Sequence, residues 1–348
     1  MKACTVKPGD LAGAGVEEIG EPPETDGPVL VEGLYVGICG TDVEIAKEGY
    51  GRPPEGHERL VLFHESLGRV LAAPAGSGFA PGDLIAGVVR RPDPEPCAAC
   101  AADRWDFCRN EQFTERGISG RDGYGAQRWR VEPKFGIRLD PGLGHLGVLL
   151  EPTSVVAKAW DQSARIAARS PGQPQSALVT GAGPIGLLAA MIGRQRGLHV
   201  TVLDRVTEGP KPKMVAELGA HYVTSLDDML IPPDVVIEAT GIGSLVFDVL
   251  GRTAPDGVVC LTGISAGTRE IPLAAEAINK AMVLRNEVVF GSVNAGLPDY
   301  AAAAAALAAA DPAWLGKIIS RTVPMAEWPA ALTRLPDDIK VVVDLQAI

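Results

Sequence analysis

The sequence predicts an α/β protein in which an irregular, mostly antiparallel β domain is joined to a doubly wound parallel sheet. Two different patterns of apolar and turn-forming residues along the 348 residues lead to this prediction. Residues 1–150 hold short β-like runs broken by glycine and proline, such as "PVLVEGLYVGI" and "DLIAGVV", and such runs favour irregular antiparallel structure. After about residue 154, apolar strand-like runs alternate with helical patterns, which is typical of a parallel sheet covered by helices.

The second half supplies its elements in regular alternation. The runs "SALVTG", "LHVTVLD", "DVVIEATG", "GVVCLTG" and "EVVFGSV" predict buried strands. The segment "GPIGLLAAMIGRQRG" predicts a helix that ends at Gly197, and the alanine-rich stretch 298–311 predicts another, because alanine has the highest helix propensity. The tail "IKVVVDL" predicts a closing strand. We expect a catalytic domain over 1–153 and 291–348, and a cofactor-binding domain over 154–290.

Composition narrows the class of protein. At 46% apolar and 22% charged residues, the chain has the balance of an ordinary globular protein. The net charge of −11 argues against nucleic-acid binding, because phosphate contacts need clustered lysine and arginine. No stretch reaches the ~18 apolar residues of a membrane span, and "MKACTVKPGD" lacks a signal-peptide apolar region, so we expect a cytoplasmic protein without a membrane partner. In such a setting the six cysteines are better explained as metal ligands or core residues than as disulfides.

A dinucleotide-binding motif opens the second domain. Gly181, Gly183 and Gly186 have G-x-G-x-x-G spacing between a predicted strand and a predicted helix, the context that a Rossmann domain requires. Asp204 ends the next strand, 18 residues after Gly186, where a carboxylate accepts from the ribose hydroxyls and repels a 2'-phosphate. Arg205 follows directly and is able to hold that phosphate. The sequence therefore favours NAD and leaves NADP open.

Further cofactor contacts are expected around the segments "TGIS" (262–265) and "GSVN" (291–294), near which the nicotinamide should lie. The full set of residues expected to contact the cofactor is Gly181, Gly183, Pro184, Ile185, Gly186, Asp204, Arg205, Thr240, Thr262, Ile264, Ser292 and Asn294.

A catalytic metal site is predicted from four scattered residues. Cys39 lies in "GICGTD", His64 and Glu65 lie in "LVLFHESLGRV", and Glu151 lies in "LLEPTSVV". Cysteine, histidine and glutamate are zinc ligands, and a catalytic zinc keeps one position open. Each residue alone is equally compatible with a structural role, but their combination beside a dinucleotide fold favours a metal. Asp42 is placed to orient His64, and the Thr41 hydroxyl is placed to pass a proton.

These motifs carry a resemblance that covers essentially the whole chain. "GICGTD", "HESLGRV", "LLEPTSVVAKAW", "GAGPIG" and "GSVN" resemble the medium-chain zinc-dependent dehydrogenases, above all their glucose 1-dehydrogenase branch. The resemblance implies a GroES-like β domain that carries the zinc and a Rossmann domain that carries NAD(P). It implies Cys39 and His64 as metal ligands, with Glu65 and Glu151 as exchangeable carboxylates. Sugar contacts are implied for Thr41, Glu115, Glu151 and Asn294.

The chain departs from the family pattern immediately before the ligand histidine. The family usually has glycine there, and this chain has Phe63. We expect the phenyl ring to narrow or reshape the wall of the substrate pocket, so the identity of the substrate follows less directly from the resemblance than the chemistry does.

The function implied by the resemblance is hydride transfer from the anomeric carbon of an aldose, above all D-glucose, to NAD(P), with a lactone as product. The catalytic residues would be Thr41, Cys39, His64, Glu65 and Glu151, with the Thr41 hydroxyl as the first proton carrier. Two alternatives stay open: the same chemistry on a polyol or a sugar-derived secondary alcohol, and a non-catalytic NAD(P)-binding sensor or structural protein. The family resemblance also suggests a homo-oligomer, either a dimer or a tetramer.

A second metal site is predicted in a cysteine-rich lobe. Cys97, Cys100 and Cys108 have spacing typical of structural zinc, whose sites are closed four-ligand tetrahedra. Related dehydrogenases use four cysteines in this lobe, and Pro94 stands where the first would be. We expect the adjacent Asp93 to be the fourth ligand, with Glu95 and Asp103 as alternatives. The opposing interpretation is a lobe that has lost its metal. In either case we expect it near a subunit contact and outside the chemistry.

Overall fold

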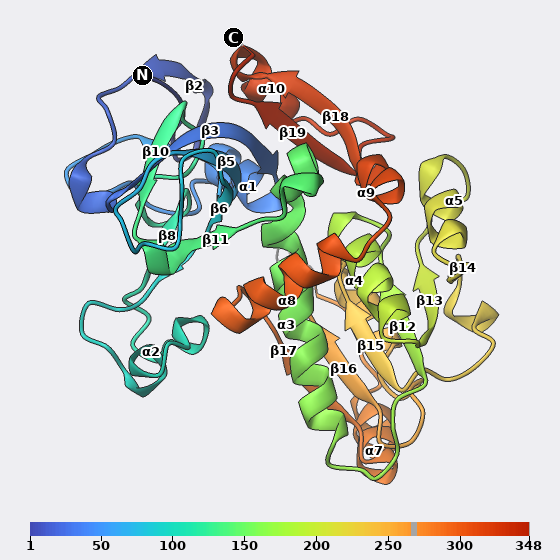
Figure 1. The fold of residues 1–348 in the computed structure, drawn as a ribbon. Coiled ribbons are helices and arrows are strands. Elements are labelled where there is room, and N and C mark those ends of the chain that lie inside the picture. Colours follow the sequence, from blue (N-terminus) through green and yellow to red (C-terminus); the bar gives the residue numbers. More distant parts are fainter. Residues whose placement is uncertain (266–269, 348) are drawn as a thin grey trace. The chain divides into compact units, whose positions relative to one another are not determined.

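The computed structural model describes residues 1–265 and 270–347, and the chain divides into two compact units. The first unit comprises Met1–Glu151 and Gly296–Ile348, and the second comprises Pro152–Ala295 (Figure 1). The observed division thus falls at 152 and 296, where the sequence pattern placed it at 154 and 291. The first unit is a GroES-like β domain and the second a parallel α/β sheet, which confirms the predicted fold class.

The first unit is built around one large sheet with the strand order β11-β6-β5-β3-β19-β18, and β10 also pairs with β3. The C-terminal strand β19 pairs antiparallel with β3, so Val341 lies opposite Ile38 at the end of β3 where the catalytic motif begins. The strands of this sheet are β3 (Val29–Ile38), β5 (Glu65–Ala72), β6 (Leu84–Gly87), β10 (Arg128–Val131), β11 (Gly136–Arg138), β18 (Ile319–Pro324) and β19 (Lys340–Asp344).

Smaller sheets and short helices complete the first unit. One small sheet has the order β2-β1-β4 and another the order β7-β8-β9. Their strands are β1 (Lys2–Lys7), β2 (Asp10–Glu18), β4 (Leu60–Val61), β7 (Arg90–Arg91), β8 (Thr114–Arg116) and β9 (Gly120–Arg121). The helical segments are η1 (Glu24–Asp26), α1 (Gly40–Glu48), α2 (Ala98–Ala101), η2 (Trp105–Phe107), η3 (Pro133–Phe135), η4 (Pro141–Leu149), α8 (Leu297–Ala308), α9 (Pro312–Ile318), η6 (Met325–Glu327) and α10 (Trp328–Ala331).

The predicted alanine-rich helix is α8, which packs through a narrow stripe of buried side chains. Tyr300, Ala303 and Leu307 are buried at helical spacing, while most of the other alanines face outward. The helix ends at Ala308, and Asp311 caps the following helix α9 by accepting from the Ala313 N–H at 2.9 Å.

The second unit contains a six-stranded parallel sheet with the order β14-β13-β12-β15-β16-β17. The order reverses beside β12, so a crevice is expected at the carboxyl ends of β12 and β15, where dinucleotides bind in such folds. The strands are β12 (Ser176–Thr180), β13 (His199–Leu203), β14 (His221–Val223), β15 (Val235–Glu238), β16 (Val258–Leu261) and β17 (Val288–Gly291). The helical segments are α3 (Leu150–Ala167), α4 (Pro184–Gln195), α5 (Pro210–Glu217), η5 (Leu226–Asp228), α6 (Gly243–Asp248) and α7 (Ala275–Arg285).

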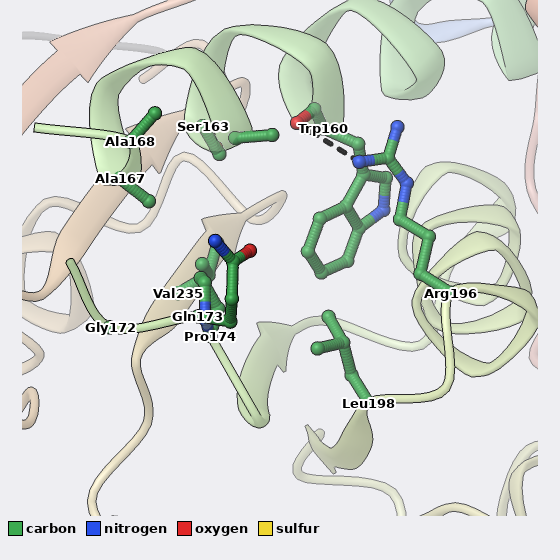
Figure 2. Close-up of a pocket in the computed structure, with 11 residues that line it drawn as sticks. Trp160, Ser163, Ala167, Ala168, Gly172, Gln173, Pro174, Arg196, Leu198 and Val235 are labelled. Atoms are coloured by element: carbon green, nitrogen blue, oxygen red, sulfur yellow. Dashed lines mark hydrogen bonds between the residues drawn. The ribbon is translucent and has the colours of Figure 1, made fainter. Parts of the chain in front are cut away.

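The core of the second unit is formed by aliphatic residues from successive strands, including Leu178, Leu203, Val236 and Val259. Helix α4 packs on β12 and β13 (Figure 1). Trp160, drawn in Figure 2, joins α3 to α4 because its indole N–H donates to the Ala189 carbonyl at 3.1 Å. Across the part of the chain that the structure describes, no helix combines the length and the apolar character that a membrane span needs.

Phe63 has a role that differs from the one expected. Its backbone φ is +72°, a left-handed conformation that glycine adopts freely and that costs a larger residue about 1–2 kcal/mol. Its ring is fully buried and meets Trp328 edge to face, with centroids 5.5 Å apart. The prediction that Phe63 reshapes a pocket wall is therefore corrected: the ring packs into the core of the first unit.

Substituting Phe63 tests two opposing contributions to stability: the cost of the left-handed backbone and the gain from burying the ring. We expect both Phe63→Ala and Phe63→Gly to destabilise the protein, because each removes a buried ring worth about 3–5 kcal/mol. The glycine variant should be the more stable of the two by about 1 kcal/mol, since only glycine relieves the left-handed backbone. Urea unfolding of the two variants beside the wild type measures the difference. Equal stability of the two variants would show that the backbone at residue 63 is not strained.

Candidate active site

Cys39 and His64 lie together in the first unit because the end of β3 lies beside the start of the antiparallel strand β5. Cys39 follows β3 and forms the N-cap of α1, whereas His64 directly precedes β5. The pairing of β3 with β5 sets Gly37 opposite Glu65. The Cys39 Sγ lies 3.2 Å from the His64 Nε2; His64 is buried, and Cys39 is partly exposed.

Glu65 completes a group of three donor atoms that lie within 4.8 Å of one another. Gly37 makes room for its carboxylate, since a Cβ at residue 37 would lie 2.0 Å from the Glu65 Oε2. Thiolate, imidazole and carboxylate are all zinc donors. The buried His64 Nδ1 and Asp42 Oδ1 have no hydrogen-bond partner among the described residues. The donor set therefore fits a catalytic zinc.

Asp42, predicted to orient His64, lies beside both Cys39 and His64. Its Oδ2 accepts from the Cys39 N–H at 2.8 Å, which closes a capping box at the start of α1. Its Oδ1 lies 3.8 Å from the His64 Nδ1, too far for a hydrogen bond but near enough for charge attraction. Thr41 lies in the same first turn of α1. Burial raises the pKa of Asp42, while the nearby imidazole opposes that rise.

Lys340 is a member of this site that sequence reasoning missed. It begins β19, is 2% exposed, and places its Nζ 2.6 Å from the Glu65 Oε1 and 3.0 Å from the Ile38 carbonyl oxygen. Burial disfavours the ammonium charge, but the Glu65 carboxylate outweighs it and raises the pKa of Lys340. A lysine at the start of the apolar run "KVVVDL" was the available signal.

Glu151 lies in the first turn of α3 and is also buried. Burial raises its pKa to about 7, and the negative Glu65 adds to the rise, whereas His64 and Lys340 oppose it. It is not one of the three residues whose donor atoms lie within 4.8 Å of one another. A carboxyl with this pKa exists in both protonation states near neutral pH, which suits proton exchange.

Glu115 is held in a buried ion pair. It lies in β8, and the Arg90 Nε donates to its Oε1 at 3.0 Å. The Arg90 guanidinium in turn stacks 3.7 Å above the centre of the Phe113 ring. The expected sugar contact of Glu115 would therefore be made by a carboxylate whose orientation Arg90 fixes.

The glycine motif of the second unit has the geometry that its spacing suggested. Gly181 has a φ of +89°, and a Cβ on Gly186 would lie 1.8 Å from the Gly181 carbonyl oxygen. A Cβ on Gly183 would meet no atom within 4 Å, so open space lies beside the N-cap of α4. A pyrophosphate is able to approach the helix there, and the partial positive charge at the N-terminus of α4 favours it.

Asp204 accepts hydrogen bonds beside this turn. Its Oδ2 accepts from the Ala182 N–H at 2.7 Å, its Oδ1 accepts from the Val206 N–H at 3.0 Å, and the Lys211 Nζ lies 3.3 Å away. Burial alone would raise the pKa of Asp204, but these hydrogen bonds and the ammonium hold it below its usual range. Asp204 is therefore a carboxylate at neutral pH, and the neighbouring Arg205 is exposed.

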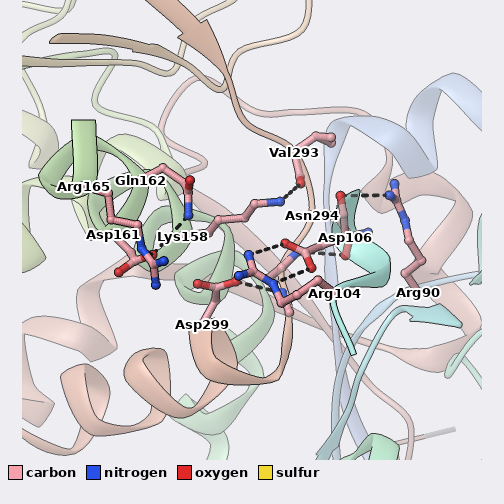
Figure 3. A network of polar contacts seen from close by, with 12 residues as sticks. Arg90, Arg104, Asp106, Lys158, Asp161, Gln162, Arg165, Val293, Asn294 and Asp299 are labelled. Atoms are coloured by element: carbon pink, nitrogen blue, oxygen red, sulfur yellow. Dashed lines mark hydrogen bonds and ion pairs between the residues drawn. The ribbon is translucent and has the colours of Figure 1, made fainter. Parts of the chain in front are cut away.

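Two buried charged residues of the second unit hold the loops expected to contact the cofactor. Glu238, which is fully buried, accepts from the Thr180 hydroxyl at 3.1 Å and from the Thr240 N–H at 2.8 Å. Its carbonyl accepts from the Thr262 hydroxyl at 2.7 Å. Lys158 of α3 donates to the Val293 carbonyl at 3.0 Å (Figure 3). Sequence reasoning named neither Glu238 nor Lys158.

The remaining residues expected to contact the cofactor differ in exposure. Ile264 is 73% exposed, whereas Ser292 is 9% exposed and its hydroxyl has no partner among the described residues. Asn294 has a left-handed backbone with φ of +58°, and its side-chain oxygen accepts from the Ala295 N–H at 2.8 Å.

The cysteine-rich lobe brings together the thiols of Cys97, Cys100 and Cys108, which lie within 4.8 Å of one another. The Asp93 Oδ2 lies 3.9 Å from the Cys108 Sγ, but Asp93 is not one of the three residues whose donor atoms lie within 4.8 Å of one another. Asp103 is instead paired with Lys134. Hydrogen bonds from backbone N–H groups, first that of Arg109, lower the pKa of Cys97 to about 6. A thiolate at neutral pH suits metal binding.

The cysteine-rich lobe contains a local ion pair that is made by two hydrogen bonds. The Arg104 guanidinium donates to both carboxylate oxygens of Asp106, at 3.2 and 3.1 Å (Figure 3). The backbone of Gly296, at the start of α8, lies against the same carboxylate, since a Cβ there would lie 3.0 Å from the Asp106 Oδ1.

Comparisons with known proteins cover both units. Residues 25–140 match the family described as "Alcohol dehydrogenase GroES-like domain", and residues 144–345 match "Glucose dehydrogenase C-terminus". The glucose 1-dehydrogenase of Thermoproteus tenax is 38% identical over 99% of this chain and 100% of its own length. That of Methanocella arvoryzae is 34% identical over the full length of both chains.

Among solved structures, the glucose dehydrogenase of Haloferax mediterranei, described in complex with NADP, Zn and gluconolactone, is similar to this chain. It has a TM-score of 0.90 and 31% sequence identity, and 99% of each chain is covered. Identity at this level along the full length, with a family match over most of the chain, confirms the resemblance drawn from the motifs. The chain belongs to the glucose dehydrogenase branch of the zinc-dependent medium-chain dehydrogenase family.

Proposed function

We propose that this enzyme oxidises the anomeric hydroxyl of D-glucose to the lactone and transfers the hydride to a nicotinamide dinucleotide. The group of Cys39, His64 and Glu65 carries the proposal, because it forms a zinc-type donor set in a chain that aligns end to end with glucose 1-dehydrogenases. The glucose dehydrogenase of Haloferax mediterranei is described with NADP, zinc and gluconolactone, which supports the same substrate, cofactor class and metal here.

Cys39 and His64 would hold the zinc, together with either Glu65 or Glu151. When bound, zinc supplies Lewis-acid chemistry that lowers the pKa of a substrate hydroxyl. Glu65 already pairs with Lys340, whereas Glu151 is the carboxyl with a pKa of about 7. We infer that Thr41 accepts the hydroxyl proton first, and that Glu115, Glu151 and Asn294 bind the remaining sugar hydroxyls.

An activity screen tests the substrate. We expect turnover on D-glucose to exceed turnover on galactose, xylose and sorbitol, because a pocket built to pair several hydroxyls rejects sugars that leave its own groups unpaired. Zinc content measured on the same preparation should include the catalytic metal. Equal or faster turnover on sorbitol would favour a polyol dehydrogenase, and an enzyme that is active without zinc would refute the proposed metal.

We further propose that the enzyme prefers NAD to NADP, because the Asp204 carboxylate lies beside the glycine-rich turn. Replacing Asp204 by Asn keeps an acceptor for the Ala182 N–H and removes the charge that repels a 2'-phosphate. The ratio of kcat/KM with NADP to kcat/KM with NAD should then rise about 10–100-fold, which corresponds to about 1.4–2.8 kcal/mol. Steady-state kinetics with both cofactors measures this ratio.

Asp227→Asn is the matched control, since Asp227 is an exposed acid of the same unit that pairs with Arg252. It should leave the ratio unchanged. A wild-type preference for NADP would instead assign the 2'-phosphate to Arg205 and Lys211, and Asp204→Asn would then change the ratio little.

We also propose that Asp93, Cys97, Cys100 and Cys108 bind a structural zinc, and that the protein is a cytoplasmic homo-oligomer, either a dimer or a tetramer. The grouping of three thiols beside Asp93 supports the metal. The family resemblance supports the oligomer, and light scattering on a size-exclusion column measures its mass. Cys108→Ser should lower the zinc content per chain by one ion, and an unchanged content would refute the lobe site.

A further inference from the structure

A cavity of about 200 Å³ lies in the second unit, at the sheet edge opposite the glycine-rich turn. Val235 begins β15 and Pro174 precedes β12, so both mark the amino ends of parallel strands. The glycine motif follows the carboxyl end of β12. The cavity is therefore separate from the place where we expect the dinucleotide. Figure 2 shows its lining, which comes from the end of α3, the following loop and the segment after α4.

The walls of the cavity are mostly apolar. The volume of the cavity is close to that of one aromatic ring. Trp160, Ala164, Ala167, Leu198 and Val235 form these walls. An apolar cavity of about 150 Å³ is sufficient to bind benzene in a protein core. A ligand with a single flat ring would therefore fill this space, and its burial against Trp160 would supply the apolar part of the affinity.

The Arg196 side chain of the lining specifies the rest of the ligand. Ser163 lies beside the cavity but is fully buried, so its hydroxyl is closed to a ligand. The Arg196 guanidinium lies 5.7 Å from the centre of the Trp160 ring and donates to the Trp160 carbonyl at 3.4 Å (Figure 2). Asp161 is a carboxylate whose charge acts on Arg196, but it pairs with Arg165, and within the described residues no carboxylate lies at ion-pair distance from Arg196. An arginine at the rim of an apolar cavity is able to form an ion pair with the carboxylate of a bound ligand.

We propose that this cavity binds an aromatic carboxylate. The ring lies against Trp160 and Ala164, and the carboxylate pairs with the Arg196 guanidinium. A sugar acid, the hydrolysis product of a lactone, also carries a carboxylate. Its many hydroxyls would be left unpaired against these apolar walls, and burying them would oppose binding. The proposal does not depend on the substrate of the enzyme.

Calorimetric titration of the full-length holoenzyme with 4-hydroxybenzoate tests the proposal. We expect one site per chain, with a Kd on the order of 0.1–1 mM for a ligand of this size. Arg196→Gln should weaken binding about 10-fold or more, because it removes a charge-assisted contact with the carboxylate. Arg252→Gln, the same change at an exposed arginine of this unit outside the cavity, should have no effect.

A second variant locates the ligand independently of charge. Ala164→Leu adds volume to a cavity wall on the exposed side of α3, and we expect it to abolish binding while the thermal midpoint stays near the wild-type value. The neutral probe 4-hydroxybenzamide and gluconate should each bind at least 10-fold more weakly than 4-hydroxybenzoate. Absence of binding by the wild type, equal binding of either comparison probe, or undiminished binding by both cavity variants would overturn the proposal.

Discussion

Replacing Cys39 by serine should abolish turnover while the protein keeps its affinity for the dinucleotide. The thiol lies 3.2 Å from the His64 Nε2 in a group of three donor atoms, and a serine hydroxyl is a much poorer zinc ligand than a thiolate. Loss of Lewis-acid stabilisation worth about 4 kcal/mol corresponds to a fall in kcat of about 10³-fold. The residues expected to bind the dinucleotide phosphates belong to the other unit, so binding of NADH should change little.

Three measurements separate this explanation from general damage to the protein. Turnover, zinc content and NADH affinity should be determined on the same preparations of wild type and Cys39→Ser. Cys4→Ala is the matched control, because Cys4 is a fully buried thiol of the same unit that lies in neither donor group found among the described residues. The control should keep both its zinc and its turnover. Normal turnover in Cys39→Ser would contradict the proposed site, and lost NADH binding would indicate a misfolded protein instead.

Short motifs were enough to predict the parts of the fold and site whose residues lie close together in the chain. The glycine motif between β12 and α4 is one continuous segment, and its three glycines have the backbone geometry that the spacing suggested. Cys39 and His64 each sit in a short recognisable phrase of sequence. They approach each other because β3 pairs with β5 in the structure.

The sequence could not predict contacts that depend on the register between distant strands. Lys340 reaches Glu65 across 275 residues only because β19 enters the sheet beside β3. No local pattern specifies that pairing, and a shift of one residue would turn Lys340 to the other face. Glu238 was missed for a similar reason, because its partners Thr180 and Thr240 converge only when β12 and β15 become neighbours.

Phe63 illustrates a different limit of sequence reasoning. Family resemblance identified the position as unusual, because glycine is the common residue there. The structure explains the preference for glycine by the left-handed backbone, and it explains the tolerance of phenylalanine by the aromatic contact with Trp328. Neither the backbone conformation of Phe63 nor the direction of its ring follows from the neighbouring residues in the sequence. The family resemblance thus identified Phe63 as an unusual residue, and its packing against Trp328 explains how the fold accommodates it.

Replacing Lys340 by methionine should destabilise the first unit by about 3–5 kcal/mol, because it leaves the Glu65 carboxylate buried without its cation. Both side chains are almost fully buried, with 2% and 3% of their surfaces exposed. The matched control is Lys134→Met, which breaks the exposed pair with Asp103 and should cost less than about 1 kcal/mol. Urea unfolding of zinc-free protein measures both effects without any contribution from metal binding.

The double variant Glu65→Gln with Lys340→Met should recover much of the lost stability, because it removes the unpaired charge together with its partner. The double-mutant cycle should give a coupling of at least about 2 kcal/mol, since both groups are buried in direct contact. With zinc present, Lys340→Met should lose less stability than the zinc-free protein, because the metal's positive charge would then compensate the Glu65 carboxylate. Additive effects in the cycle would mean that Lys340 stabilises the fold through the Ile38 carbonyl alone, and that Glu65 is not held by it.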